Sequence, residues 1–596
     1  MSERRTALRF MADVVLRASP GWLVACGAIT VGSAVCMSAY PYGLRLLLDG
    51  LLGDRHQEMA AGLVVFATSY TIGWACGVLG ANVGFELSDR VGLYVTQRTA
   101  SYLNAITGIA HLEDPASVRD LDLVRERQNQ LANIPRHVLS LLQVLLRLAV
   151  VMVLLATVYP PLAVLPLAGL APYLSERAAA RRRERVEEAL AADKRLADAL
   201  FALTVDPSAA VELRVFALGE EVAARHRAVS DTIVARTARS VLVGTALRAA
   251  GWLVFTAAMA TGVGVTILRA AHGRSTPGEL LMTITLVRRI QLQFSQVADV
   301  WQQLLGGYRT AVRLARIAGL ARSDADRRGR GRPVPDRLRS GLRLDGVSFR
   351  FGDRDWALRG VTLELPAGSV VALVGENGAG KSTLINLLTR MYEPTEGRLT
   401  ADGVDLHAFD AAAWREHTAG ALQDYMRYEL TAGRNVGVGD VARVDDEGAV
   451  LAALDRAGSA DVVRALADGP ATELGRHGRS GAGGELSGGQ WQKLALARGM
   501  MRPDPLLLVL DEPTASLDPE AEYRLFERYA AAARRLGART GGVTVLVSHR
   551  LATARTADLI VVLAGGRVAQ VGTHAQLSAA SGPYATLLEL QTRVYQ

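Results

Sequence analysis

The chain has 596 residues, of which half are hydrophobic, with a mean hydropathy of +0.17 and a formal net charge of +8. This length exceeds that of one compact domain, and this hydropathy excludes an ordinary soluble enzyme, so part of the chain should lie in a membrane. The arginines flank apolar runs without interleaved aromatic side chains, which argues against a nucleic-acid partner and favours anionic membrane lipid.

Six apolar runs in the N-terminal half predict membrane-spanning helices. A span needs about 20 apolar residues, so the fourth run must continue as a helix beyond Leu174. A tight break is expected at Tyr159-Pro160-Pro161, between the third and fourth spans. The six runs cover residues 21–48, 61–83, 137–158, 163–174, 241–268 and 277–305.

The arginines also predict the orientation of these spans. They are concentrated before the first span and after the fourth, whereas the loops on the other side carry only Arg55, Arg269 and Arg274. The positive-inside rule then places both termini and two long loops in the cytoplasm. These loops, residues 85–136 and 177–240, have helical patterns with short breaks near Pro115 and Pro207.

The sixth span carries polar side chains at helical spacing. Because polar groups are costly in hydrocarbon, this stripe should face a water-filled cavity. Its residues include Arg288, Arg289, Gln291, Ser295, Asp299 and Gln302, and the third and fifth spans add Arg147 and Arg248. Two interpretations remain open. The arginines either snorkel or pair with Asp299 and helix carbonyls, or they form a basic vestibule for an anionic or polar substrate.

The composition changes after the sixth span. Residues 1–320 form the predicted transmembrane domain, and the charged segment 321–341, which contains Gly and Pro, is the predicted linker. From residue 342 to 590, short apolar runs alternate with helical patterns, which predicts an α/β domain.

A glycine-rich loop begins the chemistry of this second domain. It stands between a predicted strand, 370–374, and a predicted helix, so it has the context of a P-loop. Its backbone N–H groups would point at phosphate oxygens. Lys381 would reach the β- and γ-phosphates, and the Ser382 hydroxyl would bind Mg²⁺. The loop consists of Gly375, Glu376, Asn377, Gly378, Ala379, Gly380, Lys381, Ser382 and Thr383.

Two further patterns complete the expected nucleotide site. A buried-strand pattern ends in Asp511 and Glu512, which suit a metal ligand and the general base that polarises the attacking water. A second predicted helix begins at a potential anion site. That site is formed by Ser487, Gly488, Gly489 and Gln490.

These motifs stand in the order found in the nucleotide-binding domain of an ABC transporter, and the whole chain resembles an exporter-type half transporter. The resemblance implies that Phe351 stacks on adenine and that Gln423 contacts Mg²⁺ and senses the membrane loops. It also implies that Asp518 bridges a dimer and His549 holds the γ-phosphate. The turns near Pro115 and at residues 211–216 resemble coupling helices.

The expected fold is therefore a six-helix, all-α transmembrane domain followed by an α/β P-loop ATPase domain. The resemblance implies ATP and Mg²⁺ as cofactors, and a second half transporter, identical or different, that completes each ATP site. The expected function is export of a peptide, lipid or small amphipathic molecule across the cytoplasmic membrane. An importer or a lipid flippase with this fold remains an alternative, whereas the apolar spans argue against a non-transport ABC ATPase.

Overall fold

The computed structural model describes residues 3–17, 19–327, 331–352, 354–475, 485–511, 519–547 and 554–594. The chain divides into two compact units. The first comprises Met1–Ser101 and Asp120–Arg316, and the second comprises Tyr102–Arg119 and Ile317–Gln596. The turn of the first long loop, hereafter loop 102–119, therefore belongs to the same unit as the C-terminal domain.

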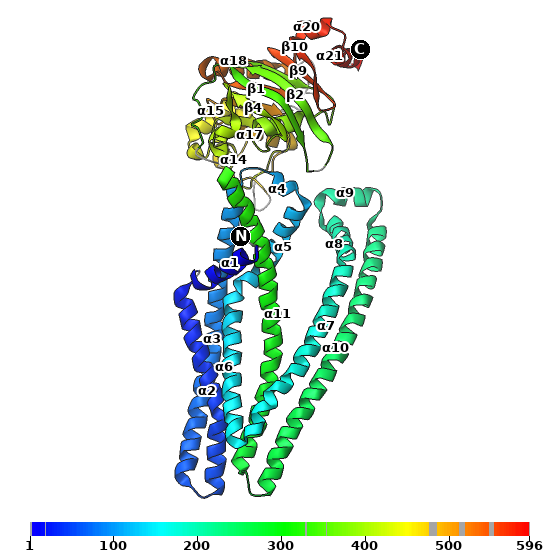
Figure 1. Ribbon diagram of the computed structural model, residues 1–596. Coiled ribbons are helices and arrows are strands. Elements are labelled where there is room, and N and C mark those ends of the chain that lie inside the picture. Colours follow the sequence, from blue (N-terminus) through cyan, green and yellow to red (C-terminus); the bar gives the residue numbers. More distant parts are fainter. Residues whose placement is uncertain are drawn as a thin grey trace. The chain divides into compact units, whose positions relative to one another are not determined.

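The first unit is helical, as its sequence predicts (Figure 1). The helices α3, α5 and α11 continue across the boundary into the second unit. The described helices are α1 (Glu3–Arg17), α2 (Pro20–Leu52), α3 (His56–Ala105), α5 (Pro115–Ala132), α6 (Ile134–Val158), the 3-10 helix η1 (Pro160–Gly169), α7 (Leu170–Ala189), α8 (Ala191–Val205), α9 (Pro207–Val215), α10 (Gly219–Ala271) and α11 (Pro277–Arg327).

Helices occupy all six places where membrane spans are expected. By length and composition, four described helices, α2, α3, α6 and α10, are apolar enough to cross a membrane. The helix α11 carries Arg288, Arg289, Asp299 and several glutamines, and α7 is rich in arginine, so both are more polar than these four helices.

The fourth span begins differently from the expected continuous α-helix. After α6 ends at Val158, residues Pro160–Gly169 form a 3-10 helix before α7 begins. Prolines lack a backbone N–H and clash with the carbonyl four residues earlier, which disfavours regular α-helix here. Pro160, Pro161 and Pro166 all fall in this segment.

The breaks expected in the long loops are confirmed. The helix α8 ends at Val205 and α9 begins at Pro207. In loop 102–119, α4 (Ala110–Glu113) is followed by Asp114, which caps α5 by accepting a hydrogen bond from the Ser117 N–H at 2.9 Å. The bonds from Ser117 and from the Ala116 N–H lower the pKa of the Asp114 carboxyl, so the cap stays ionised.

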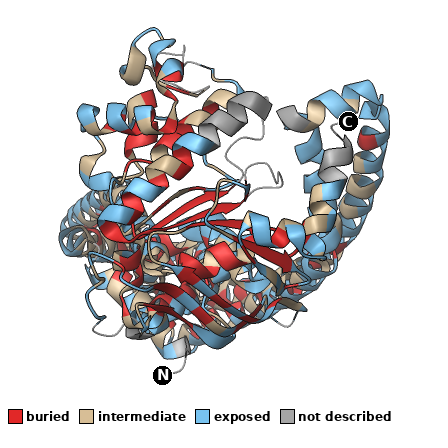
Figure 2. Cartoon of the chain, turned by 90° about the horizontal axis from the view of Figure 1, so that it is seen from above, coloured by how far each residue is buried: buried red, intermediate tan, exposed pale blue. Residues whose placement is uncertain are grey.

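The second unit contains two sheets and the helices around them, and its strands are mostly buried (Figure 2). One sheet is antiparallel, in the order β2-β1-β4-β5, and the other has the order β10-β9-β3-β8-β7-β6. The second sheet is parallel except where β10 pairs with β9. The strands are β1 (Gly341–Arg350), β2 (Trp356–Pro366), β3 (Val370–Val374), β4 (Glu396–Ala401), β5 (Val404–Asp405), β6 (Thr418–Ala421), β7 (Leu507–Asp511), β8 (Val543–Val547), β9 (Leu559–Ala564) and β10 (Arg567–Gly572).

The helices of this unit surround the parallel sheet in the sequence order of an α/β domain. The described helices are α12 (Lys381–Leu388), η2 (Leu406–Ala408), α13 (Ala411–Glu416), α14 (Ala432–Gly437), η3 (Val441–Arg443), α15 (Glu447–Ala457), α16 (Ala460–Arg464), η4 (Gly469–Ala471), α17 (Gly488–Gly499), α18 (Pro519–Thr540), α20 (His574–Ala579) and α21 (Pro583–Val594).

The predicted linker needs correction at both ends. The helix α11 runs through Arg327, so the first residues of segment 321–341 are helical. Further along, the Arg332 N–H donates to the Ala408 carbonyl, and the Leu338 N–H donates to the Thr540 carbonyl at 2.8 Å. Backbone hydrogen bonds therefore attach residues 331–340 to the C-terminal domain, which a composition rich in Arg and Gly did not indicate.

Candidate functional site

The glycine-rich loop connects the buried strand β3 to the helix α12. All five residues of β3 are buried, because the strand lies between β8 and β9 in the parallel sheet. The loop follows the carboxyl end of this strand, which is where ligands bind in open α/β sheets. Glu376, Asn377 and Gly378 are exposed there.

Two positions of the loop require glycine, because there is no room for a side chain and because the backbone conformation there favours glycine. A Cβ on Gly375 would lie 2.4 Å from the Leu563 carbonyl oxygen. Gly380 has a φ of 100° as the N-cap of α12, and a Cβ there would lie 2.8 Å from the Ala357 carbonyl oxygen. No side chain fits at either position, so the loop presents its backbone N–H groups at the start of a helix. This arrangement suits phosphate.

The Lys381 side chain binds the backbone of the glycine-rich loop. Its Nζ donates to the carbonyl oxygens of Gly375 and Glu376, at 2.8 Å each, and only 7% of the residue is exposed. The ammonium is therefore fixed beside the helix N-terminus where phosphates would bind. The next residue, Ser382, is exposed and Thr383 is half-buried.

Asp511 and Gln423 follow neighbouring strands of the same sheet. Asp511 is the last residue of β7 and is buried, and Gln423 follows the end of β6 and is exposed. Among the described residues no group of three or more His, Cys, Asp or Glu could hold a metal by itself. Magnesium commonly binds through one carboxylate plus substrate phosphates, so Ser382 and Asp511 fit Mg²⁺ carried by a nucleotide.

Three expected catalytic or dimer residues lie outside the described residues. They are Glu512, Asp518 and His549. The described chain reaches Asp511 at the end of β7 and Val547 at the end of β8, and these two residues are paired in the sheet. The roles of the three residues remain predictions.

The second predicted anion site begins the helix α17. Ser487 and Gln490 form a reciprocal capping box, in which the Ser487 N–H donates to Gln490 Oε1 at 2.8 Å and the Gln490 N–H donates to Ser487 Oγ at 3.3 Å. Ser487 and Gly488 are exposed, and Gly489 is half-buried. The helix packs on α14, α15 and β6, which fixes the direction of its exposed N-terminus.

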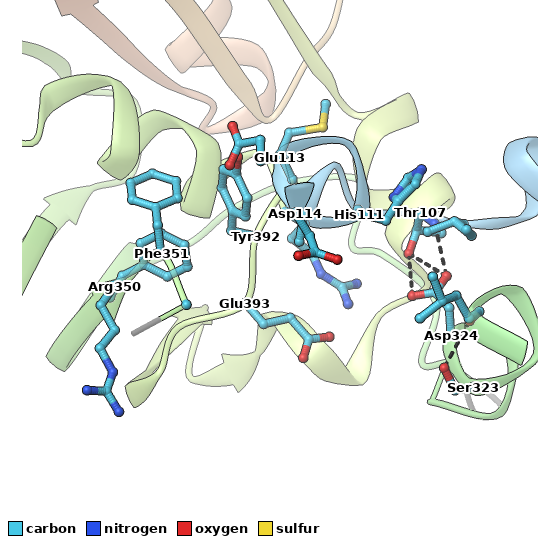
Figure 3. Close-up of a pocket in the computed structure, with 18 of the residues that line it drawn as sticks. Thr107, His111, Glu113, Asp114, Ser323, Asp324, Arg350, Phe351, Tyr392 and Glu393 are labelled. Carbon is cyan, nitrogen blue, oxygen red and sulfur yellow. Dashed lines mark hydrogen bonds between the residues drawn. The ribbon is translucent and has the colours of Figure 1, made fainter. Parts of the chain in front are cut away.

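Phe351 belongs to an aromatic cluster at the end of β1. Its ring meets Phe349 and Tyr392 edge-on, with centroid distances of 4.9 and 5.5 Å. The cluster lines a cavity of about 1200 Å³ together with residues of loop 102–119 (Figure 3). The described lining includes no residue of the glycine-rich loop, so adenine stacking on Phe351 remains a prediction.

Sequence patterns did not indicate the other groups in this cavity. Glu113 points toward the Tyr392 hydroxyl, and burial, followed by this carboxylate, raises the pKa of that hydroxyl (Figure 3). Burial also lowers the pKa of His111 below its ordinary value. Glu113 and Tyr392 are far apart in the sequence, so only the break before Pro115 marked this region.

The arginines of the first unit divide into paired and unpaired groups. Arg45 pairs with Glu279 at 2.9 Å, and Arg248 lies 3.5 Å from Glu176. Among the described residues, Arg147 and Arg289 form no ion pair. Arg248 therefore pairs with a carboxylate, although with Glu176 and not with Asp299, and both sequence interpretations of the other arginines stay predictions.

Of the arginines without an ion pair among the described residues, Arg147 and Arg289 both face α2. Arg147 Nη2 donates to Ser33 Oγ at 3.0 Å, and its Nε is buried without a described hydrogen-bond partner. Arg289 lies 4.4 Å from the centroid of the Tyr40 ring and donates to Met37 Sδ at 3.6 Å. In the described part of the chain, these contacts are a hydroxyl, a ring and a thioether, and no carboxylate pairs with either guanidinium.

Comparison with known proteins agrees with this geometry. The ABC transporter family model matches residues 358–515. The ATP-dependent lipid A-core flippase of Cupriavidus metallidurans is 37% identical over 347 residues, which are 56% of this chain and 55% of that protein. The ABC multidrug transporter MDR1 of Cryptococcus neoformans is 37% identical over 254 residues, 42% of this chain and 17% of that protein.

A solved structure matches nearly the whole fold. A bacterial Atm1-family ABC exporter with ATP bound aligns with a TM-score of 0.76 and 25% identity, over 97% of this chain and 98% of that one. The chain spans about half the length of the curated flippases it matches.

Proposed function

We propose that this chain, which belongs to the ABC transporters and has the fold of an exporter-type half transporter, hydrolyses ATP to move an amphipathic substrate across a membrane. The observation that carries the proposal is the phosphate loop. Gly375 and Gly380 leave room only for backbone, and Lys381 is fixed by two hydrogen bonds at the N-terminus of α12. This cradle suits the β- and γ-phosphates of a nucleotide.

Different residues of this chain would then have different roles in ATP hydrolysis. The loop N–H groups and Lys381 orient the phosphates, and Ser382 and Asp511 would hold Mg²⁺, which neutralises developing charge on the phosphate oxygens. Gln423 would add a metal contact, and Glu512 would take a proton from the attacking water. His549 would contact the γ-phosphate.

A complete site requires a second chain in this proposal. Ser487, Gly488, Gly489 and Gln490 form an exposed anion site that lies at the start of a different helix from the phosphate loop. In a dimer, this segment of one copy would close over the nucleotide bound by the other, with Asp518 at the contact. A homodimer with two working sites fits one intact set of motifs per chain, and a different half transporter is the alternative.

The membrane location and the direction of transport are part of the same proposal. Arginine distribution supports a cytoplasmic membrane with the ATPase domain and both termini in the cytoplasm. Export is the expected direction. The curated relatives named as lipid A-core flippases support a lipid flippase as the principal alternative.

Two substitutions test hydrolysis separately from binding. Lys381→Met should lower both ATP affinity and ATP hydrolysis by about 100-fold or more, because the phosphates lose their fixed cation. Glu512→Gln should lower hydrolysis by about 100-fold or more while ATP affinity is retained, because only the proposed base is lost. Binding of a fluorescent ATP analogue and phosphate release by the purified chain in lipid nanodiscs measure the two effects.

Lys493→Met provides the matched control. Lys493 also lies in the ATPase domain, but its ammonium pairs with Asp461 at 2.8 Å near the surface. Loss of such a pair should leave ATP affinity and hydrolysis within about twofold of wild type. Wild-type hydrolysis by the Glu512 variant would refute the assigned base, and wild-type affinity of the Lys381 variant would refute the phosphate site.

The unpaired arginines support an anionic group on the substrate. Leaving Arg147 and Arg289 without a carboxylate is costly at membrane depth, and an anion bound against α2 would neutralise both. We therefore expect dodecyl phosphate to stimulate ATP hydrolysis in phosphatidylcholine nanodiscs more than uncharged dodecyl maltoside does. Replacing both arginines by glutamine should raise the half-maximal concentration of dodecyl phosphate by about tenfold.

Arg248→Gln is the control for this test. Arg248 has the same charge, but Glu176 already neutralises it in part. This variant should keep the wild-type response to dodecyl phosphate. Equal responses of wild type and the double variant would remove the anionic-substrate proposal without affecting that of ATP hydrolysis.

A further inference from the structure

Loop 102–119 is attached to the ATPase domain through its own backbone. The Thr107 carbonyl oxygen accepts a hydrogen bond from Arg415 Nη2 at 2.5 Å, and the Ile109 N–H donates to the Met391 carbonyl at 3.2 Å. Between them, a Cβ on Gly108 would lie only 3.0 Å from the same Met391 oxygen. Three consecutive residues of the loop therefore lie against the ATPase domain, Thr107 at the Arg415 side chain and Gly108 and Ile109 at the Met391 backbone.

Arg415 also binds the end of the phosphate-loop helix. It lies on α13, and its Nη2 donates to the Arg390 carbonyl at 2.6 Å while its Nε donates to the Thr389 carbonyl at 3.3 Å. Thr389 is the C-cap of α12, and Arg390 follows it with a left-handed φ of 56°. A cation bound to the last carbonyls of a helix complements the negative end of the helix dipole. One guanidinium thus joins the carboxyl end of α12 to loop 102–119.

Thr107 is held from its other side by α11. Its N–H donates to Asp324 Oδ2 at 2.9 Å, and its hydroxyl donates to the same oxygen at 2.8 Å (Figure 3). Asp324 lies in the last turn of α11, and α3 ends at Ala105, two residues before Thr107. The ends of α3 and α11 that belong to the second unit are thereby connected at one residue that Arg415 contacts.

The helix between the phosphate loop and Arg415 is short. It has eight residues, which corresponds to about 12 Å of rise. Lys381 is its first residue and Thr389 is its C-cap, so a displacement at the phosphate end is carried to the carbonyls that Arg415 binds.

We propose that Arg415 is a positioning residue through which occupancy of the phosphate loop sets the position of loop 102–119 and, through Thr107 and Asp324, of the ends of α3 and α11. This inference rests on the proposed function, because it assumes that ATP binds the phosphate loop. It adds a contact at the carboxyl end of α12 to the role expected of Gln423. Arg415 touches no phosphate in this assignment and acts only through α12.

Amide hydrogen exchange measures this connection without relying on activity. The full-length chain in lipid nanodiscs would be compared with and without Mg²⁺ and a non-hydrolysable ATP analogue, and peptides covering residues 103–113 would be followed. In wild type, the analogue should change exchange at Thr107 and Ile109. Arg415→Met should make these amides exchange about tenfold faster and abolish the difference that the analogue causes, because the loop loses its tie to α12.

Two further variants make the outcome decisive. Gly108→Ala keeps Arg415 but pushes the loop from Met391, so it should also reduce the nucleotide response of the loop even if the Arg415 variant does not fold. Arg456→Met is the matched control. Arg456 is another half-buried arginine of this domain, and it donates to the Met500 carbonyl at 2.8 Å without contact to the loop. Its replacement should leave exchange in residues 103–113 unchanged.

The possible failures are distinguishable. A wild-type chain that does not bind the analogue contradicts the proposed function itself. A chain that binds the analogue with no change in residues 103–113, or an Arg415 variant with the wild-type response, overturns only the inference about Arg415. An Arg456 variant that reproduces the loss would also overturn it, since the effect would then be general destabilisation.

Discussion

At the scale of single residues, Gly375 and Gly488 of the ATPase domain are glycines for different physical reasons. A Cβ on Gly375 would collide with the Leu563 carbonyl, so the fold of this chain requires a glycine there. A Cβ on Gly488 would meet nothing within 4 Å, although this residue opens α17. The missing side chain at Gly488 is therefore better explained by a close approach of something outside this chain, such as a nucleotide bound to a second copy.

Gly488→Ala tests this distinction. The thermal unfolding temperature should stay at the wild-type value, because the added methyl group has open space around it. ATP hydrolysis should nevertheless fall about tenfold, since the methyl group would stand between the α17 backbone and the phosphate of a partner-bound nucleotide. Calorimetry and phosphate release on the same preparation measure both. An unfolding temperature that falls together with the activity would assign Gly488 to the fold instead.

The residues that sequence could identify are those within contiguous motifs. Lys381 and Ser487 each stand in a short pattern whose backbone conformation is set locally by glycines and caps. Arg415 and Tyr392 could not be found in this way. Their roles depend on contacts with Thr107 and Glu113, which stand 308 and 279 residues earlier in the chain, and such contacts leave no periodicity in one sequence.

At the scale of elements, the hydrophobic periodicity of the sequence predicted where the long helices lie, but it did not predict where several of them begin or end. The breaks at Pro115 and Pro207 are where proline predicts them. The 3-10 helix η1 was not predicted, because its apolar composition is equally compatible with an α-helix. Its prolines are the sequence feature that could have indicated it. The helix α11 extends to Arg327 because charged residues can continue an exposed helix as readily as they form a linker.

The strands show the same limit. The buried run of β3 was predicted because a parallel strand buried on both faces is a continuous apolar stretch. The order β10-β9-β3-β8-β7-β6 was not predicted, since pairing between distant strands is a tertiary property. That order is what places Asp511 two strands away from the glycine-rich loop, at the same edge of the sheet.

At the scale of the whole molecule, the second compact unit includes loop 102–119 as well as the C-terminal part from Ile317 onward. Loop 102–119 belongs to the ATPase unit, because Thr107 and Ile109 bond to Arg415 and Met391 within it. A domain in the structural sense therefore includes a segment that the sequence assigns to the membrane part. In the proposed transporter, the polypeptide chain and these hydrogen bonds would both connect the ATP site to the helices α3 and α11.

The proposed ATP site is shared between two chains. Each copy supplies a phosphate loop around Lys381 and an exposed segment beginning at Ser487, and neither alone would enclose a nucleotide. Two defects placed in different copies should consequently leave one intact site, whereas the same defects in one copy should leave none.

Complementation between two inactive variants tests whether the ATP site is shared between two chains. Lys381→Met and Gly488→Asp chains with different affinity tags would be expressed separately and together, and ATP hydrolysis by the purified mixed dimers would be measured in nanodiscs. Each variant alone should be inactive, and the mixed dimer should recover about half of the wild-type rate, because one of its two sites is intact. Mixed dimers that form but remain as inactive as either parent would contradict a site shared between two chains.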